Sequence, residues 1–258
     1  MYKYFKIAKQ SALSAGKILK DNFLKQKKIE YKGRIDIVTN VDREAEQEIM
    51  RIIRKHFPEH NILTEETKTT IDKNIEYCWV IDPLDGTTNY AHRFPFVAVS
   101  VGLQIKGESV IGIVYNPILD ELFWGIKGEG SFVGNKKICV SQTNKLSKAF
   151  LATGFPYDVA VSKENNLDHF ARMIMKCMAI RRAGSAALDL CYLANGIFDG
   201  FWELKLHPWD TAAAMVIVQE AGGKITKFDG TEFNIFDKKI IASNGIIHQQ
   251  MLSVLNEK

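Results

Sequence analysis

The stretch WVIDPLDGTTNY, from Trp79 to Tyr90, decides what kind of protein this sequence encodes. Its first half is an apolar strand that ends in two aspartates three positions apart, and its second half is a Gly-Thr-Thr-Asn turn. Carboxylate oxygens are ligands that hard divalent cations prefer. Backbone N–H groups at a glycine turn that opens a helix attract phosphate oxygens. The stretch therefore predicts metal-assisted chemistry on a phosphate group.

Composition is typical of a globular protein with a substantial core. The chain has 258 residues, of which 46% are hydrophobic and 25% charged. The net charge is only +4, and Lys and Arg form no long basic run, which argues against direct nucleic-acid binding. No apolar window of about 18 residues predicts a membrane span. The four cysteines are scattered and predict neither disulfides nor a zinc site, so we expect a cytoplasmic protein.

Hydrophobic periodicity predicts an α+β fold. Apolar residues spaced at 3.6 positions predict a helix over residues 4–23 and a second helix that stops before Pro58. Residues 96–133 have the alternation of a short-stranded antiparallel meander. In the remaining chain we expect a strand to Thr153, strands over Ala179–Arg182, Phe198–Glu203 and Ile240–Ala242, and helices over Glu164–Cys177, Ser185–Ala194, Asp210–Ala221 and Gly245–Leu255.

These elements predict two layered parts without a flexible linker. A helix pair would cover an antiparallel sheet, and a second sheet with its own helices would follow. No Pro-, Gly- or Ser-rich segment and no internal repeat separates the parts. We therefore expect one domain over residues 1–258, in which halves of roughly 1–145 and 146–258 share one active-site cleft.

Several acidic residues are candidate metal ligands, and each also has an ordinary structural explanation. Asp82 and Asp85 follow a strand and flank a proline, a position that acids seldom occupy merely to make a turn. Glu65 is equally consistent with a solvated surface acid. Asp42 and Asp210 stand at predicted helix starts, where capping and the helix dipole favour an acid.

Two other acidic motifs do not match the spacing. A calcium loop that began at Asp82 would need Glu at its twelfth position, where this chain has Arg93. Phosphatases that form an aspartyl-phosphate typically place two aspartates two positions apart, whereas Asp82 and Asp85 are three apart. A covalent aspartyl mechanism is therefore disfavoured.

Several separate motifs resemble those of the inositol monophosphatase family, and most closely its bacterial branch. Trp79–His92 is similar to the family's first signature, and Trp209–Gly223 is similar to its second. Between them, Arg181–Leu190 is similar to the substrate-side Gly-Ser/Thr-Ala segment. The segment Lys32–Asp42 and the pair Glu65-Glu66 fit the family in order and spacing, so the resemblance spans nearly the whole chain.

The resemblance implies a layered αβαβα sandwich, Mg²⁺-dependent hydrolysis of small phosphate monoesters, and a homodimer. Glu65 and Thr87 would orient and deprotonate the attacking water, and Asp42 would orient a further water. Thr64 departs from the family pattern, which usually has a small residue there, often Gly. The implied metal ligands are Glu65, Asp82, the backbone carbonyl of Leu84, Asp85 and Asp210.

The resemblance also implies which residues contact the substrate. Backbone N–H groups of Gly86 and Thr87 would hold the phosphate, and Glu203 would accept hydrogen bonds from hydroxyl groups of the alcohol. Arg181 either adds positive charge near the phosphate or pairs with an acid at a subunit interface. The full implied substrate set is Glu65, Leu84, Asp85, Gly86, Thr87, Arg181, Gly184, Ser185, Ala186, Glu203 and Asp210.

We therefore expect a Mg²⁺-dependent hydrolase that releases phosphate from myo-inositol 1-phosphate, a small phosphorylated polyol. One alternative keeps this reaction and changes the substrate to fructose 1,6-bisphosphate, NADP or a nucleotide 3′-phosphate. Another alternative is a regulatory role at RNA polymerase, to which some bacterial relatives are linked. The sequence alone leaves these alternatives open.

Overall fold

The computed structural model describes residues 1–26, 29–31, 37–67, 72 and 75–257. Lys32, part of the resemblance above, lies outside these residues. The helices are α1 (Tyr2–Asn22), α2 (Asn40–His56), α3 (Thr87–Ala91), α4 (Leu167–Ile174), α5 (Ala186–Ala194), α6 (Pro208–Glu220) and α7 (His248–Leu255), with one 3₁₀ turn, η1 (Leu146–Lys148). The strands are β1 (Ile29–Tyr31), β2 (Ile37–Thr39), β3 (Asn61–Thr64), β4 (Tyr77–Asp85), β5 (Ala98–Ile105), β6 (Glu108–Asn116), β7 (Glu121–Ile126), β8 (Gly130–Val133), β9 (Lys136–Lys137), β10 (Phe150–Thr153), β11 (Ala179–Arg181), β12 (Gly200–Leu204), β13 (Lys224–Thr226) and β14 (Lys239–Ser243).

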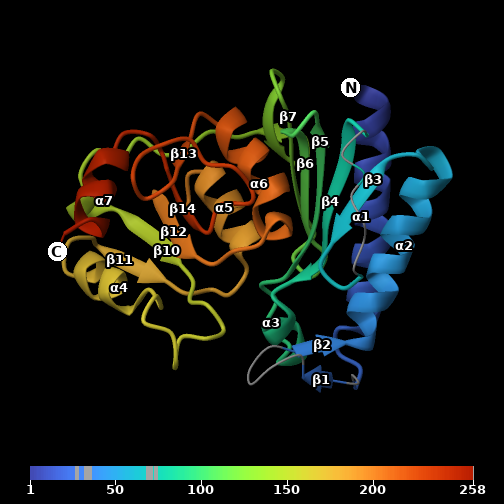
Figure 1. The fold of residues 1–258 in the computed structure, drawn as a ribbon, viewed down its shortest axis with the longest axis horizontal. Helices are drawn as coiled ribbons and strands as arrows, with labels where there is room; N and C mark the ends of the chain where they lie inside the picture. The colour runs from blue at the N-terminus through green and yellow to red at the C-terminus, as the bar shows by residue number, and fades with distance from the viewer. Residues whose placement is uncertain (27–28, 32–36, 68–71, 73–74, 258) are drawn as a thin grey trace.

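Helices and sheets alternate in layers, which confirms the expected α+β sandwich. In Figure 1, α1 and α2 cover the outer face of the sheet that contains β3–β7, and α5 and α6 lie between this sheet and the second one. Helices α4 and α7 cover the far face of the second sheet. The burial pattern matches this arrangement, because α2 buries its apolar stripe while α6 is buried along most of its length.

The two large sheets differ in topology, and β1 and β2 form a separate two-stranded sheet. The first sheet has the order β3-β4-β5-β6-β7-β8-β9, and from β4 onward neighbouring strands are antiparallel, as the meander pattern predicted. The second has the order β11-β10-β12-β14-β13, with β10 parallel to both β11 and β12. None of the helices in the described ranges is long and apolar enough to cross a membrane.

A row of three glycines lets α6 lie directly on the first sheet. Gly102, Gly112 and Gly125 are register partners on β5, β6 and β7. A Cβ atom at Gly112 would stand 2.0 Å from the carbonyl oxygen of Ala213 on α6. At Gly102 and Gly125 the closest helix atoms would lie at 3.1 and 3.2 Å. The glycines therefore set how closely α6, and Asp210 in its first turn, approach the sheet.

Several predicted boundaries shift for identifiable reasons. Helix α6 begins at Pro208, two residues earlier than expected, because proline suits the first helical turn. Strand β4 continues through Asp85, with an irregular register between Asp82 and Asp85. Helix α4 begins later than predicted, since Asn166 before it has a positive φ of 72°, and it ends at Ile174. Helix α7 begins only at His248, and the short strands β1, β9 and β13 were not predicted. The division into halves near residue 145 stays a prediction.

Candidate active site

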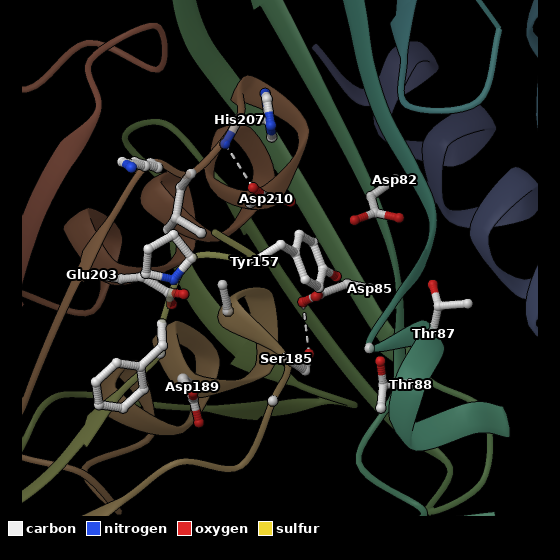
Figure 2. A pocket seen from close by; sticks show the side chains of 18 of the residues that line it. Asp82, Asp85, Thr87, Thr88, Tyr157, Ser185, Asp189, Glu203, His207 and Asp210 are labelled. Carbon is white, nitrogen blue, oxygen red and sulfur yellow. Dashed lines mark hydrogen bonds between the residues drawn. The ribbon is translucent and has the colours of Figure 1, made fainter. Parts of the chain in front are cut away.

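One cavity of about 310 Å³ gathers almost all of the predicted site residues (Figure 2). It lies where the ends of β3 and β4 and the start of α3 face the first turns of α5 and α6 and the end of β12. Segments far apart in the sequence therefore line one cavity. The predicted residues among its lining are Glu65, Asp82, Leu84, Asp85, Gly86, Thr87, Gly184, Ser185, Ala186, Glu203 and Asp210.

The end of β4 folds back on itself to present its two aspartates. The amide of Leu84 donates to Asp82 Oδ1 at 2.9 Å, and the Thr87 hydroxyl donates to the Leu84 carbonyl at 3.1 Å. Gly86 has a φ of +92°, which favours glycine, and an added Cβ would lie 3.0 Å from the Phe96 carbonyl oxygen. The Asp-Pro-Leu-Asp-Gly sequence thus turns a buried strand directly into α3.

Asp85 connects the first sheet to α5. Its Oδ2 accepts a hydrogen bond from the Ser185 hydroxyl at 2.6 Å and one from the Ala187 amide at 2.7 Å. The carboxylate therefore receives donors from the first turn of α5, where amides lack partners within the helix. Desolvation raises the pKa of Asp85 to about 6, although these hydrogen bonds favour its ionised form.

Asp42 does not line the cavity but supports Thr87 from behind. It is buried in the first turn of α2, and it accepts from the Thr39 hydroxyl and, at 3.1 Å, from the Thr39 amide. The Thr87 hydroxyl lies 3.2 Å from Asp42 Oδ1, so its single proton has two acceptors, Asp42 and the Leu84 carbonyl. Burial raises the pKa of Asp42 to about 6. The Thr87 oxygen keeps lone pairs that can accept from a water.

The acids of the cavity repel one another. Desolvation raises the pKa of Asp82 well above its usual range, and the charges of Glu65, Asp85 and Asp210 raise it further. The pKa of Asp210 is raised in the same way, although its carboxylate accepts from the His207 amide at 2.6 Å. Such a donor set fits a hard cation, which would relieve this repulsion.

The metal-ligand set itself stays a prediction. In the described part of the chain, no three His, Cys, Asp or Glu side chains form a group that could hold a metal ion as they stand. Asp82, Asp85 and Asp210 nevertheless lie on the same side of the cavity in Figure 2, away from Glu203 and Asp189.

Arg181 does not line the cavity, and its two predicted roles, charge near the phosphate and pairing with an acid at a subunit interface, stay predictions. Its guanidinium lies over the Phe150 ring, 4.7 Å from the centroid, outside the cavity, and Arg182 lines the cavity instead. Arg181 is the last residue of β11, and neighbouring residues of an extended segment point to opposite sides. A substrate role for Arg181 is therefore not supported by its position.

Two residues beside Glu203 in the cavity were not among the predicted site residues. Asp189 Oδ1 is the buried side-chain oxygen that lacks a hydrogen-bond partner within the described ranges. An acid inside the otherwise apolar helix α5 is the signal that could have revealed it. Gly154 makes room for Glu203, because a Cβ there would stand 2.0 Å from Glu203 Oε1. Desolvation raises the pKa of Glu203 to about 8.

Comparison with known proteins gives the same assignment along the whole chain. The model of the inositol monophosphatase family matches residues 1–258. An inositol-1-monophosphatase of Synechocystis is 41% identical, with 98% of this chain and 88% of that protein covered. A fructose-1,6-bisphosphatase/inositol-1-monophosphatase of Aquifex aeolicus is 44% identical, with 98% and 95% covered. The Nus factor SuhB of Escherichia coli is 38% identical, with 100% and 97% covered.

Solved structures of similar proteins share this fold. The inositol monophosphatase of Anabaena superposes with a TM-score of 0.90 at 40% identity, with 98% of this chain and 95% of that chain covered. An IMPase/NADP phosphatase complexed with Mg²⁺ and phosphate superposes with a TM-score of 0.84 at 26% identity, with 95% and 92% covered. The chain is a phosphatase that belongs to the inositol monophosphatase family.

Proposed function

We propose that this phosphatase uses Mg²⁺ to hydrolyse myo-inositol 1-phosphate. The observation that carries the proposal is the meeting of acids from β4 and α6 with the Gly86–Thr87 turn in one cavity. A similar structure holds Mg²⁺ and phosphate, and an inositol-1-monophosphatase is 41% identical to this chain. By this resemblance we also propose that the protein is a cytoplasmic homodimer.

The proposed Mg²⁺ ligands are Glu65, Asp82, the Leu84 carbonyl, Asp85 and Asp210. When bound, the ions supply positive charge that neutralises the phosphoryl oxygens and makes a water more acidic. Most of the catalysis of phosphoryl transfer is positioning and charge stabilisation. The burial of these ligands would strengthen the effect of that charge on the phosphoryl oxygens.

The chain's own groups would hold the phosphate and orient the water. The Gly86 and Thr87 amides begin α3, and amides there lack partners within the helix. The Thr87 hydroxyl donates toward Asp42 or the Leu84 carbonyl, so its oxygen would accept a hydrogen bond from the attacking water. Glu65 would receive the water's proton, and Asp42 would fix the direction of the Thr87 hydroxyl.

The acids at the far end of the cavity favour a hydroxyl-rich alcohol. Glu203 and Asp189 are both buried there, and each carboxylate can accept a hydrogen bond from a ring hydroxyl. Fructose 1,6-bisphosphate is the second candidate substrate, because the relative from Aquifex aeolicus carries both activities in its name. NADP is a further candidate substrate, because one similar structure is an IMPase/NADP phosphatase. A regulatory role is a further candidate function, because a Nus factor is among the relatives.

Phosphate release by the purified protein tests the proposal. Myo-inositol 1-phosphate, fructose 1,6-bisphosphate and NADP are each supplied with Mg²⁺ and, separately, with excess EDTA. We expect turnover led by inositol 1-phosphate, which EDTA abolishes. Faster phosphate release from another ester would contradict the proposed substrate. No release from any of the esters by folded protein would contradict the proposed hydrolase activity.

The Asp85→Asn variant tests whether the charge of a cavity acid contributes to catalysis. It removes charge while the side chain keeps its size, and we expect kcat to fall at least about 100-fold, as when a preorganised electrostatic group is lost. Asp229→Asn makes the same change on an exposed loop and serves as the control. Equal activity of the two variants would contradict the proposed role of Asp85. A regulatory function that survives Asp85→Asn would favour the interaction alternative.

A further inference from the structure

Glu46 is a buried carboxylate behind the segment that carries Glu65. It lies on α2, one turn after Asp42, and only 1% of its surface is exposed. Burying a carboxylate is costly unless hydrogen bonds compensate it. A buried acid here therefore calls for an explanation beyond the packing of α2 on the sheet.

Three donors surround the Glu46 carboxylate, and all come from the segment 64–67. The Thr64 hydroxyl donates to Oε2 at 2.6 Å, and the Glu66 amide donates to the same oxygen at 3.0 Å. The Thr67 hydroxyl donates to Oε1. Both carboxylate oxygens are thus used, by residues on either side of Glu65.

This geometry fixes the backbone around a proposed metal ligand. Glu65 lines the cavity, while the residues before and after it are tied to α2. Hydrogen bonds to an ionised acceptor are about twice as strong as neutral ones. A ligand held on both sides needs less ordering when a cation binds.

The arrangement also explains the departure at Thr64. The resemblance led us to expect a small residue, often glycine, at this position, and a glycine has no hydroxyl to donate. In this chain the Thr64 hydroxyl provides one of the three bonds to Glu46. The threonine therefore strengthens the attachment of the segment instead of loosening it.

We infer that Glu46 is a positioning residue that holds segment 64–67 so that Glu65 is set for a divalent cation. Glu46 does not line the cavity and acts only through the segment. The inference rests on the proposed function for the identity of the cation. The hydrogen bonds that carry it are independent of that identity.

Titration calorimetry with Mg²⁺ alone tests the inference in four variants. Glu46→Gln keeps one carbonyl acceptor, Glu46→Leu removes both acceptors, and Thr64→Val with Thr67→Val removes two donors at nearly constant volume. Glu44→Gln makes the same charge change at an exposed position of α2 and serves as the control. We expect the Mg²⁺ Kd to rise about 10-fold in Glu46→Gln and towards 100-fold in Glu46→Leu, as when groups that support metal ligands are removed.

Two further measurements separate positioning from general destabilisation. Raising the Mg²⁺ concentration should restore kcat in Glu46→Gln, and hydrogen exchange should show faster exchange of the Glu66 amide. If every variant that melts cooperatively binds Mg²⁺ within two-fold of Glu44→Gln, the inference is overturned. Should Glu46→Leu fail to fold, the Thr64/Thr67 double variant decides.

Failure of the proposed function has a different signature. Wild-type protein that neither binds Mg²⁺ nor releases phosphate would overturn the proposed function alone. The hydrogen bonds between Glu46 and segment 64–67 would then be tested by hydrogen exchange at the Glu66 amide. Its protection against exchange must fall in Glu46→Gln and stay unchanged in Glu44→Gln. Unchanged protection in Glu46→Gln would overturn the inference whatever the activity.

Discussion

Replacing Gly112 by alanine tests whether the close spacing between α6 and the first sheet is needed for stability and for activity. The added Cβ would stand 2.0 Å from the Ala213 carbonyl oxygen and 2.7 Å from its carbonyl carbon. Ordinary contact begins near 3.4 Å, so the helix or the strand must move by about 1.4 Å. Both partners are backbone in the interior, where no flexible side-chain end can yield instead.

The expected cost lies at the upper end of the range for overpacked cores. We expect Gly112→Ala to lower the free energy of unfolding by about 3 kcal/mol. In a chain of this size that loss corresponds to a fall in Tm of about 6–12 °C. Because α6 carries Asp210 in its first turn, displacement by about 1 Å should also lower kcat/KM up to about 100-fold.

Calorimetry and initial rates at 25 °C measure the two effects on the same preparation. Gly102→Ala and Gly125→Ala are graded controls, because their closest helix atoms would lie at 3.1 and 3.2 Å and need only small shifts. We expect both to lose less stability than Gly112→Ala. A Tm of Gly112→Ala within about 2 °C of wild type, or a larger loss in Gly102→Ala, would refute the reasoning.

Two other predictions concern Gly154 and His248. Gly154→Ala places a Cβ 2.0 Å from Glu203 Oε1. Because this oxygen is the end of a flexible side chain that can move aside, we expect a small change in Tm but about a tenfold loss of kcat/KM on inositol 1-phosphate. Unchanged kinetics would contradict the proposed role of Glu203 in substrate binding. Burial lowers the pKa of His248 to about 4, so between pH 7 and pH 5 the unfolded chain binds a proton that the native chain does not. The contribution of His248 to the free energy of unfolding should therefore fall by about 2 kcal/mol over that interval. The raised pKa values of Asp42, Asp85 and Glu203 act in the opposite direction, so the measured quantity is the difference between wild type and His248→Gln in urea titrations at pH 7 and pH 5; the same pH dependence in both would contradict the prediction.

The chemistry of the site could be predicted wherever it lies within one continuous segment. The stretch from Asp82 to Thr87 brings acids and a glycine turn together by sequence alone, and five of its six residues, all except Pro83, line the cavity. Strand periodicity likewise predicted the meander of the first sheet. These inferences depend only on local geometry, which sequence spacing fixes.

Features that depend on how distant elements meet were not predictable in the same way. Arg181 and Arg182 differ by one position, and a one-residue change reverses the direction of a side chain in a strand. The row of Gly102, Gly112 and Gly125 follows from strand register, which the sequence does not state. The bonds from Glu46 to segment 64–67 likewise depend on the packing of α2 beside β3.

The structural and functional explanations of the acids turn out to be compatible. Asp42 and Asp210 occupy the same position in the first turns of α2 and α6, where each accepts from the amide of its capping residue. Asp85 accepts from the first turn of α5. The positive ends of three helices thus face three acids, which favours each ionised carboxylate and offsets part of the repulsion between Asp85 and Asp210. Of these acids, Asp85 and Asp210 line the cavity, so a hydrogen bond at a helix start and a place in the cavity are compatible in one side chain, and the capping explanation of Asp210 does not argue against its proposed role.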